Sequence, residues 1–147
     1  MKTTLLIALL STCCGLALGQ TTGPPEASPR DLHAAQCVAA LEVNTQELAQ
    51  QVKAGHDASR RVLLDRLVSG TAFVGDTYLH GASDEKQARA LANQALEAQK
   101  SLSAQELAAR QAACADEGAR LFASSNGLEQ AVVKRLAKKR MDKLLGA

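Results

Sequence analysis

The chain has 147 residues, 46% of them hydrophobic, and a formal net charge of +2 at pH 7. This length suffices for one hydrophobic core and not for two. The chain contains 28 Ala and 22 Leu but only three aromatic residues, Phe73, Tyr78 and Phe122. Because strong helix formers dominate, the composition predicts an all-α protein and disfavours a large aromatic-lined ligand pocket.

Residues 1–19 have the features of a signal peptide. Lys2 precedes the apolar run 5–10, and small residues occupy the positions before the expected cleavage near Gly19–Gln20. We therefore expect a periplasmic or secreted protein. Acylation of Cys13 is the minority alternative, because the Thr before it is a poor residue at that position of a lipoprotein signal. The apolar run is too short to span a membrane.

A flexible linker is expected over 20–28, where Gly23-Pro24-Pro25 interrupts any helix. A single helical domain then occupies 29–147, because helical patterns follow one another from there with short connections only.

The first helix is predicted over 29–53. Ser28 can cap it, Pro29 suits the first helical position, and Gly55 follows its end. Asn44 falls within the apolar stripe, either as a buried polar group that sets the register or at the edge, reaching water. The stripe comprises Ala34, Cys37, Val38, Leu41, Leu48 and Val52.

The second helix is predicted over 58–80, with Gly81 as its C-terminal stop. Gly70 in its interior costs about 1 kcal/mol of helix stability relative to Ala. Gly70 therefore either divides the helix or lies where a neighbouring helix comes close, and its place on the inward face favours the close approach. That face comprises Leu63, Leu67, Gly70, Val74 and Tyr78.

Three further helices are predicted over 84–100, 104–123 and 128–145. Ser103 and Glu106 form a capping box that starts the helix over 104–123. The helix over 128–145 is apolar on one side, which comprises Val133, Leu136, Ala137, Met141 and Leu144.

Four helices of similar length predict an up-down-up-down four-helix bundle, with the basic C-terminal helix as an addition. Removal of the signal peptide leaves two cysteines, Cys37 and Cys114, and such a pair in an oxidising compartment predicts one disulfide. The two residues lie about 12 and 13 Å from adjacent ends of an antiparallel first and fourth helix, so their heights match. The bridge is expected to contribute about 4 kcal/mol of stability.

No catalytic, metal or cofactor site is predicted. His33 and Cys37 share one helix face and can hold a metal ion if Cys114 joins them, but zinc or copper needs a further ligand, and His56 and His80 lie in connections. The chain has no Cys-x-x-Cys motif, nucleophile elbow, phosphate-binding glycine loop or paired-carboxylate signature. We therefore expect neither an enzyme nor a bound cofactor.

Two regions are candidate partner surfaces. Phe73 and Tyr78 form the ring-rich stretch, although the simpler interpretation is that they are the bulkiest core residues. Residues 128–147 carry six basic side chains against two acidic ones, a charge of +4, whereas 20–127 carry −3. Such asymmetry suits an anionic partner, but basic residues also complement a helix dipole and cover a solvated face. The six are Lys134, Arg135, Lys138, Lys139, Arg140 and Lys143.

The sequence thus predicts an exported, non-catalytic helical protein that binds another protein in the periplasm. Its build resembles that of periplasmic immunity or inhibitor proteins, and of small envelope stress proteins, in architecture only. The alternative is an envelope-associated structural or stress factor that contacts anionic membrane surfaces through the basic C-terminal helix. Nucleic acid is not expected as a partner, because export removes the usual target. The sequence determines neither the oligomeric state nor where the last helix packs.

Overall fold

The computed structural model describes residues 27–81 and 84–146, and within them it contains helices and no strand. This confirms the all-α prediction. The predicted signal peptide, Cys13 and most of the linker over 20–28 lie outside the described residues. The helices are α1 (Pro29–Glu42), α2 (Thr45–Lys53), α3 (Asp57–His80), α4 (Glu85–Gln99), α5 (Ala104–Ser124) and α6 (Gly127–Leu145).

Side-chain caps mark the start of four of these helices. Ser28 accepts a hydrogen bond from the amide of Asp31, and Asp84 caps α4 in the same way. Helices α5 and α6 begin with reciprocal capping boxes, Ser103 with Glu106 and Asn126 with Glu129. Each box satisfies amide groups that the first helical turn leaves unpaired, which explains why these boundaries are visible in the sequence.

The helix expected over 29–53 is in fact two helices, and this prediction was wrong. Asn44 breaks it by adopting a left-handed backbone with φ of 66°, a conformation that Asn tolerates better than most residues. Its side chain is exposed, so it is not a buried register-setting group. The freed carbonyl of Val43 accepts from Arg66 at 3.2 Å, and Gln111 Nε2 donates to the carbonyl of Ala40 at 2.9 Å. Side chains that are distant in the sequence thus donate hydrogen bonds to the carbonyl groups at the end of α1.

The break redirects the chain from one hydrophobic cluster to another. The first cluster joins α1, α3 and α5 and contains Ala34, Cys37, Leu41, Phe73 and Cys114. The second joins α2, α3 and α6 and contains Ala49, Leu63, Leu67, Ala137 and Met141. A straight helix over 29–53 would carry one continuous stripe, whereas these residues face two different sets of neighbours. Helix α3 contributes to both clusters and is therefore the central element.

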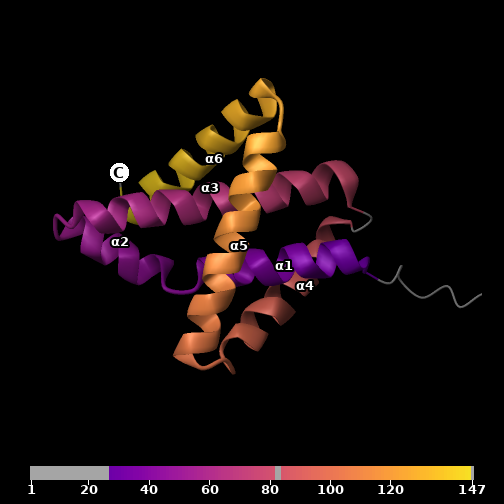
Figure 1. The fold of residues 1–147 in the computed structure, drawn as a ribbon, viewed down its shortest axis with the longest axis horizontal. Coiled ribbons are helices and arrows are strands. Elements are labelled where there is room, and N and C mark those ends of the chain that lie inside the picture. Colours follow the sequence, from indigo (N-terminus) through magenta and orange to yellow (C-terminus); the bar gives the residue numbers. More distant parts are fainter. Residues whose placement is uncertain (1–26, 82–83, 147) are drawn as a thin grey trace, which may run out of the picture.

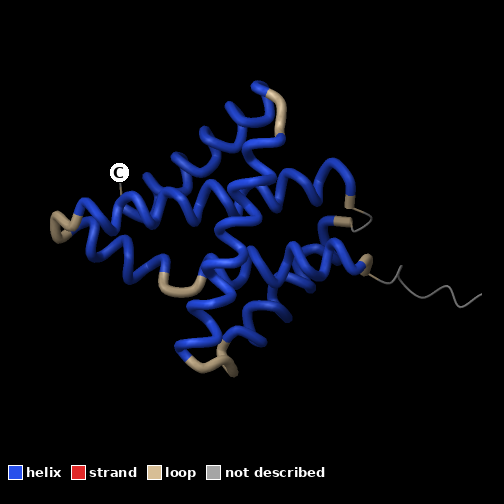
Figure 2. The backbone as a smooth tube through the Cα atoms, viewed as in Figure 1, coloured by secondary structure: helices blue, strands red, loops and turns tan. Residues whose placement is uncertain are grey.

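The helices cross rather than run along a common axis (Figure 1). Helices α1 and α2 run back along α3, α5 lies across α1 and α3, and α6 packs on α3 and α2. Helix α4 packs mainly on α1. The tube in Figure 2 shows the short loops that make these changes of direction. The predicted up-down-up-down four-helix bundle is therefore not confirmed, and the C-terminal helix α6 belongs to the core.

The buried face of α3 changes along the helix. Leu63 and Leu67 are buried as expected, but Val74 and Tyr78 are exposed. Ser69, Ala72 and Phe73 are buried in their place. The predicted inward face was wrong in this half, because the cover of α3 changes from α2 and α6 to α1 and α5, and the buried stripe rotates to meet it.

Helices α3 and α5 approach most closely at Gly118. A methyl group at this position would lie 2.6 Å from Cβ of Ser69 and 2.8 Å from its Cα and carbonyl oxygen. The Ser69 hydroxyl donates to the carbonyl of Ala115 at 3.1 Å, so the close approach also holds an interhelical hydrogen bond. Gly70, for which we expected the close approach, has no atom within 4 Å of such a methyl group and leaves α3 unbroken.

We predict opposite effects for two glycine substitutions. Gly118→Ala should lower the free energy of unfolding by about 1–3 kcal/mol, because the added methyl group meets backbone atoms of Ser69. Gly70→Ala should raise it by up to about 1 kcal/mol, because the site is open and Ala is the better helix former. Denaturant unfolding of both variants measures this, and a Gly118→Ala protein as stable as the wild type would contradict the crossing.

The capping box of α5 should make stability depend on pH. The hydrogen bond from the Ser103 side chain, and then that from its backbone amide, lowers the pKa of the Glu106 carboxyl. The ionised carboxylate therefore stabilises the fold at neutral pH, and its contribution disappears as the pH falls through this lowered pKa. We expect Glu106→Gln to be less stable than the wild type at neutral pH and equal to it in acid. A difference that persists in acid would show that charge is not the cause.

Candidate functional site

Cys37 of α1 and Cys114 of α5 form a disulfide where the two helices cross, with Cα atoms 5.2 Å apart. This confirms the predicted pairing. Both side chains are buried in the first hydrophobic cluster. The expected matching of heights along antiparallel helices is not what brings them together. Two crossing helices touch at only one point along each helix axis, and the disulfide lies at that point.

Two polar side chains flank the disulfide at the surface. His33 Nε2 lies 2.9 Å from Oε2 of Glu117 and 3.9 Å from Sγ of Cys37, and the His33 ring meets Phe73 edge-on. Glu117 was not identified from the sequence, because 84 residues separate it from His33. Its only sequence signal was its place three residues after Cys114, on the same side of α5.

The two rings of the predicted ring-rich surface lie in different environments. Phe73 is 2% exposed and is among the largest fully buried side chains of the described residues. Its assignment to a partner surface was therefore wrong, and the simpler interpretation as a core residue is correct. Tyr78 is 89% exposed. The difference arises because five residues along a helix turn the side chain by about 140°.

Tyr78 belongs to a larger exposed apolar surface that the sequence did not reveal. Helix α6 exposes one apolar residue in each of three turns, and Leu128 is 77% exposed. Four members of the surface line a single groove of about 350 Å³ between α3 and α6, and the other two line the adjoining groove. We call this surface the α3–α6 face; it comprises Val74, Tyr78, Leu79, Leu128, Val132 and Leu136.

The sequence does contain a signal for the α3–α6 face. Leu128, Val132 and Leu136 recur every four residues, a spacing that places them on one side of α6. Leu136 was assigned to the buried side with Val133 and Ala137, and this was wrong. Val133 and Ala137 are buried against α3 and α2, while Leu136 stays exposed.

The six basic residues of α6 are all exposed. Two of them have partners that orient them. Arg140 donates to Oε1 of Glu42 at 2.7 Å, and the Lys134 ammonium lies 5.4 Å from the centre of the Phe122 ring. An exposed ion pair of this kind contributes little to stability, so the basic residues remain available to a partner. Arg140 also lines the groove that contains Val74 and Leu136, which places positive charge beside the apolar face.

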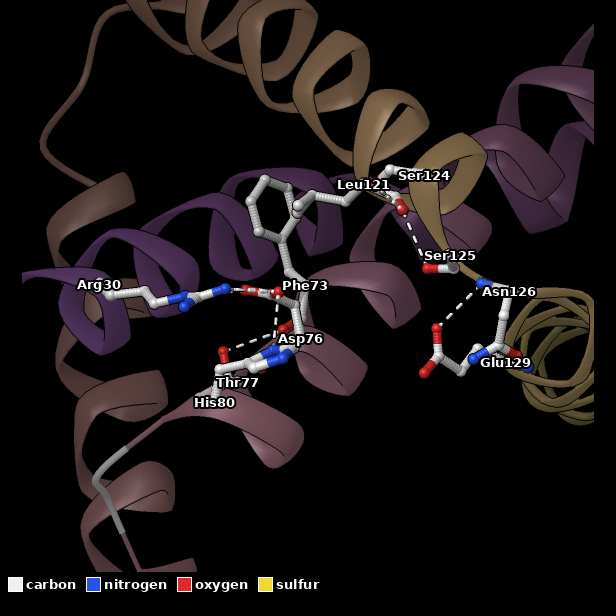
Figure 3. A network of polar contacts seen from close by, with 10 residues as sticks. All are labelled: Arg30, Phe73, Asp76, Thr77, His80, Leu121, Ser124, Ser125, Asn126 and Glu129. Carbon is white, nitrogen blue, oxygen red and sulfur yellow. Dashed lines mark hydrogen bonds and ion pairs between the residues drawn. The ribbon is translucent and has the colours of Figure 1, made fainter.

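A polar network borders the α3–α6 face at the end of α3 (Figure 3). Arg30 of α1 donates to both carboxylate oxygens of Asp76, at 2.6 and 3.0 Å. His80 Nδ1 lies 3.3 Å from the same carboxylate. At the start of α6, Glu129 accepts from the amide of Asn126. The network and the cap hold the ends of α3 and α6 in place, and therefore hold the apolar side chains between them.

A further groove of about 570 Å³ lies between α1, α3 and α4. Its lining includes the small side chains of Ala34, Ala88 and Ala92, and also Val74 and Tyr78 of the α3–α6 face. Three carboxylates, those of Asp31, Asp84 and Glu85, also line this groove.

No helix within the described ranges is both long and apolar enough to cross a lipid bilayer. No protein-family model matches the chain, and no curated protein or solved structure is significantly similar to it.

The disulfide should carry much of the stability. It closes a loop of 77 residues, for which restriction of the unfolded chain suggests about 4 kcal/mol. We expect the double variant Cys37→Ser, Cys114→Ser to lose about 2–5 kcal/mol of unfolding free energy relative to the oxidised protein. Alkylation and mass spectrometry under non-reducing conditions should find no free thiol at either position in protein isolated from the cell envelope. Two free thiols there would contradict the assignment.

Proposed function

We propose that this chain is an exported, non-catalytic helical protein that binds another protein in the periplasm through the α3–α6 face. The observation that carries the proposal is the clustering of six large apolar side chains, all exposed, at facing ends of two helices. Contiguous apolar surface of this kind, next to polar residues, is typical of interaction sites on soluble proteins.

The chemistry of the face indicates the kind of partner. Tyr78 supplies an exposed aromatic side chain, a residue type that is enriched at interface centres. Helix α6, which carries Leu128, Val132 and Leu136, also carries six exposed basic residues. Most of these basic residues follow the apolar ones toward the end of the helix, so the apolar surface is bordered by positive charge. We infer a partner with an apolar strip bordered by carboxylates, because charge complementarity speeds encounter and sets the register.

Two observations support export. The first nineteen residues have the features of a signal peptide, and the protein contains a buried disulfide of the kind that persists in oxidising compartments. The same basic helix also suits the alternative, contact with an anionic membrane surface. A row of apolar residues beside basic ones favours binding at the boundary between lipid and water. Protein binding is the better account, because half of the face comes from α3 and forms a groove with α6.

A matched pair of substitutions tests the proposal. Val132 and Val62 are both the sixth residue of their helix, and they are 48% and 43% exposed, but only Val132 belongs to the face. We expect Val132→Asp to weaken capture of a stoichiometric partner from periplasmic extract by about tenfold or more, because the carboxylate is desolvated in an apolar contact and repels an acidic rim. Val62→Asp should bind as the wild type does. Thermal unfolding checks that both variants are folded.

Other outcomes separate the two functions. Equal capture by both valine variants would overturn the proposed face. Salt-sensitive binding to vesicles of anionic phospholipid, with no stoichiometric protein partner, would favour the membrane alternative. Point variants are needed because deletion of α6 would expose Val133, Ala137 and Met141, which are buried in the core.

A further inference from the structure

Four side chains that bind metals in other proteins meet where α1 crosses α5. His33 and Cys37 lie one turn apart on α1, and Cys114 and Glu117 lie about one turn apart on α5. The His33 nitrogen, the Cys37 sulfur and a Glu117 oxygen all lie within 4.8 Å of one another. This cluster is separate from the α3–α6 face and has no part in the proposed protein binding.

The imidazole of His33 lies between the other two donor atoms. The same nitrogen, Nε2 of His33, contacts both the Glu117 carboxylate at 2.9 Å and the Cys37 sulfur at 3.9 Å. A catalytic relay would place the acid and the thiol on opposite ring nitrogens. Around a tetrahedral zinc ion, bond lengths of 2.0–2.3 Å set donor atoms about 3.3–3.8 Å apart. His33 and Cys37 are already close to that separation. The Glu117 oxygen has to move about 0.5 Å away from His33 and up to about 1 Å toward Cys37, and the two sulfurs move apart once their bond is broken.

We propose that the dithiol form of this protein binds one zinc-like divalent ion through Cys37, Cys114, His33 and Glu117, and that disulfide formation expels the ion. Two thiolates, one imidazole and one carboxylate form a four-ligand set of the type that zinc accepts. The two sulfurs are buried, whereas His33 and Glu117 are partly exposed at 54% and 38%, which gives an ion a route from solvent.

The redox step is a thiol–disulfide exchange. A dithiol reductant supplies two electrons and two protons, the sulfur–sulfur bond between Cys37 and Cys114 breaks, and the reductant becomes a disulfide. Binding of the ion then releases the two thiol protons, because thiolates are the metal ligands. In the reverse exchange a disulfide oxidant accepts two electrons from the two thiolates and, with two protons from water, becomes a dithiol. The sulfur–sulfur bond between Cys37 and Cys114 forms again, so that only His33 and Glu117 remain as ligands.

Contacts other than the disulfide also hold the crossing. Gln111 of α5 donates to the carbonyl of Ala40, one turn from Cys37. On the other side of Cys114, Gly118 lies directly against Ser69 of α3. One contact ties α5 to α1 and the other ties it to α3, which itself packs on α1, so α1 and α5 should stay together after reduction and keep the four ligands within reach of one ion.

The test uses Co²⁺ alone as a spectroscopic probe of the full mature chain. The protein is reduced with a phosphine, freed of reductant under argon and titrated. We expect one Co²⁺ per chain, with thiolate-to-metal charge transfer and the visible bands of tetrahedral coordination. His33→Ala and Glu117→Gln should each weaken binding by about tenfold or more, because even partners of ligands contribute at this level. His80→Ala is the matched control, since His80 also pairs with a carboxylate but has no cysteine beside it.

Several results would overturn the proposal. The first is the absence of a charge-transfer band, and the second is equal Co²⁺ binding by the Cys37→Ser, Cys114→Ser protein. The others are undiminished Co²⁺ binding by both His33→Ala and Glu117→Gln, and Co²⁺ binding by the oxidised protein as tight as by the reduced one. Circular dichroism follows folding throughout. If reduction unfolds the chain, the metal must restore its helices, because binding to the assembled site is coupled to folding; failure to do so counts against the site.

Discussion

The crossing of α5 over α1 and α3 is the constraint on which the rest of the structure depends. One face of α5 carries Gln111, Cys114 and Gly118, its buried residues, at intervals of three and four. Each makes a different contact: a hydrogen bond to the end of α1, a disulfide to its middle, and direct backbone approach to α3. The disulfide and the approach at Gly118 need only small side chains, which suits a core built mainly from Ala and Leu.

The divided core follows from this crossing. Because α1 and α5 cover the second half of α3, the first half has to find other cover, which α2 and α6 provide. The chain can serve both clusters only by turning at Asn44, where Arg66 and Gln111 satisfy the carbonyls that the helix leaves open. Burial lowers the pKa of the Arg66 guanidinium, in keeping with its place between α1 and α5. The polar groups therefore lie where the two clusters meet.

The functional candidates divide between the two sides of this scaffold. The α3–α6 face lies over the junction of two helices whose ends are held by the Arg30–Asp76 pair and by the Asn126 cap. The metal-ligand cluster lies at the α1–α5 crossing, where buried sulfurs sit beneath an exposed His33 and Glu117. Both candidates consist of residues brought together from distant parts of the chain. A short motif therefore contains only part of each candidate: the spacing of His33 and Cys37 in one, and that of Leu128, Val132 and Leu136 in the other.

What the sequence alone determined was local. Composition settled the helical class, and the capping residues Ser28 and Ser103 marked helix starts, because caps act within four residues of one another. The pairing of the two cysteines followed from their number once a signal peptide was assumed. Only the tertiary structure decided the break at Asn44, the exposure of Leu136 and the approach of Glu117 to His33. Periodicity shows that a helix has an apolar side, but which neighbour covers that side depends on how the helices cross. Here small residues allow the helices to cross closely, and the position of the crossing cannot be derived from the sequence of any one helix.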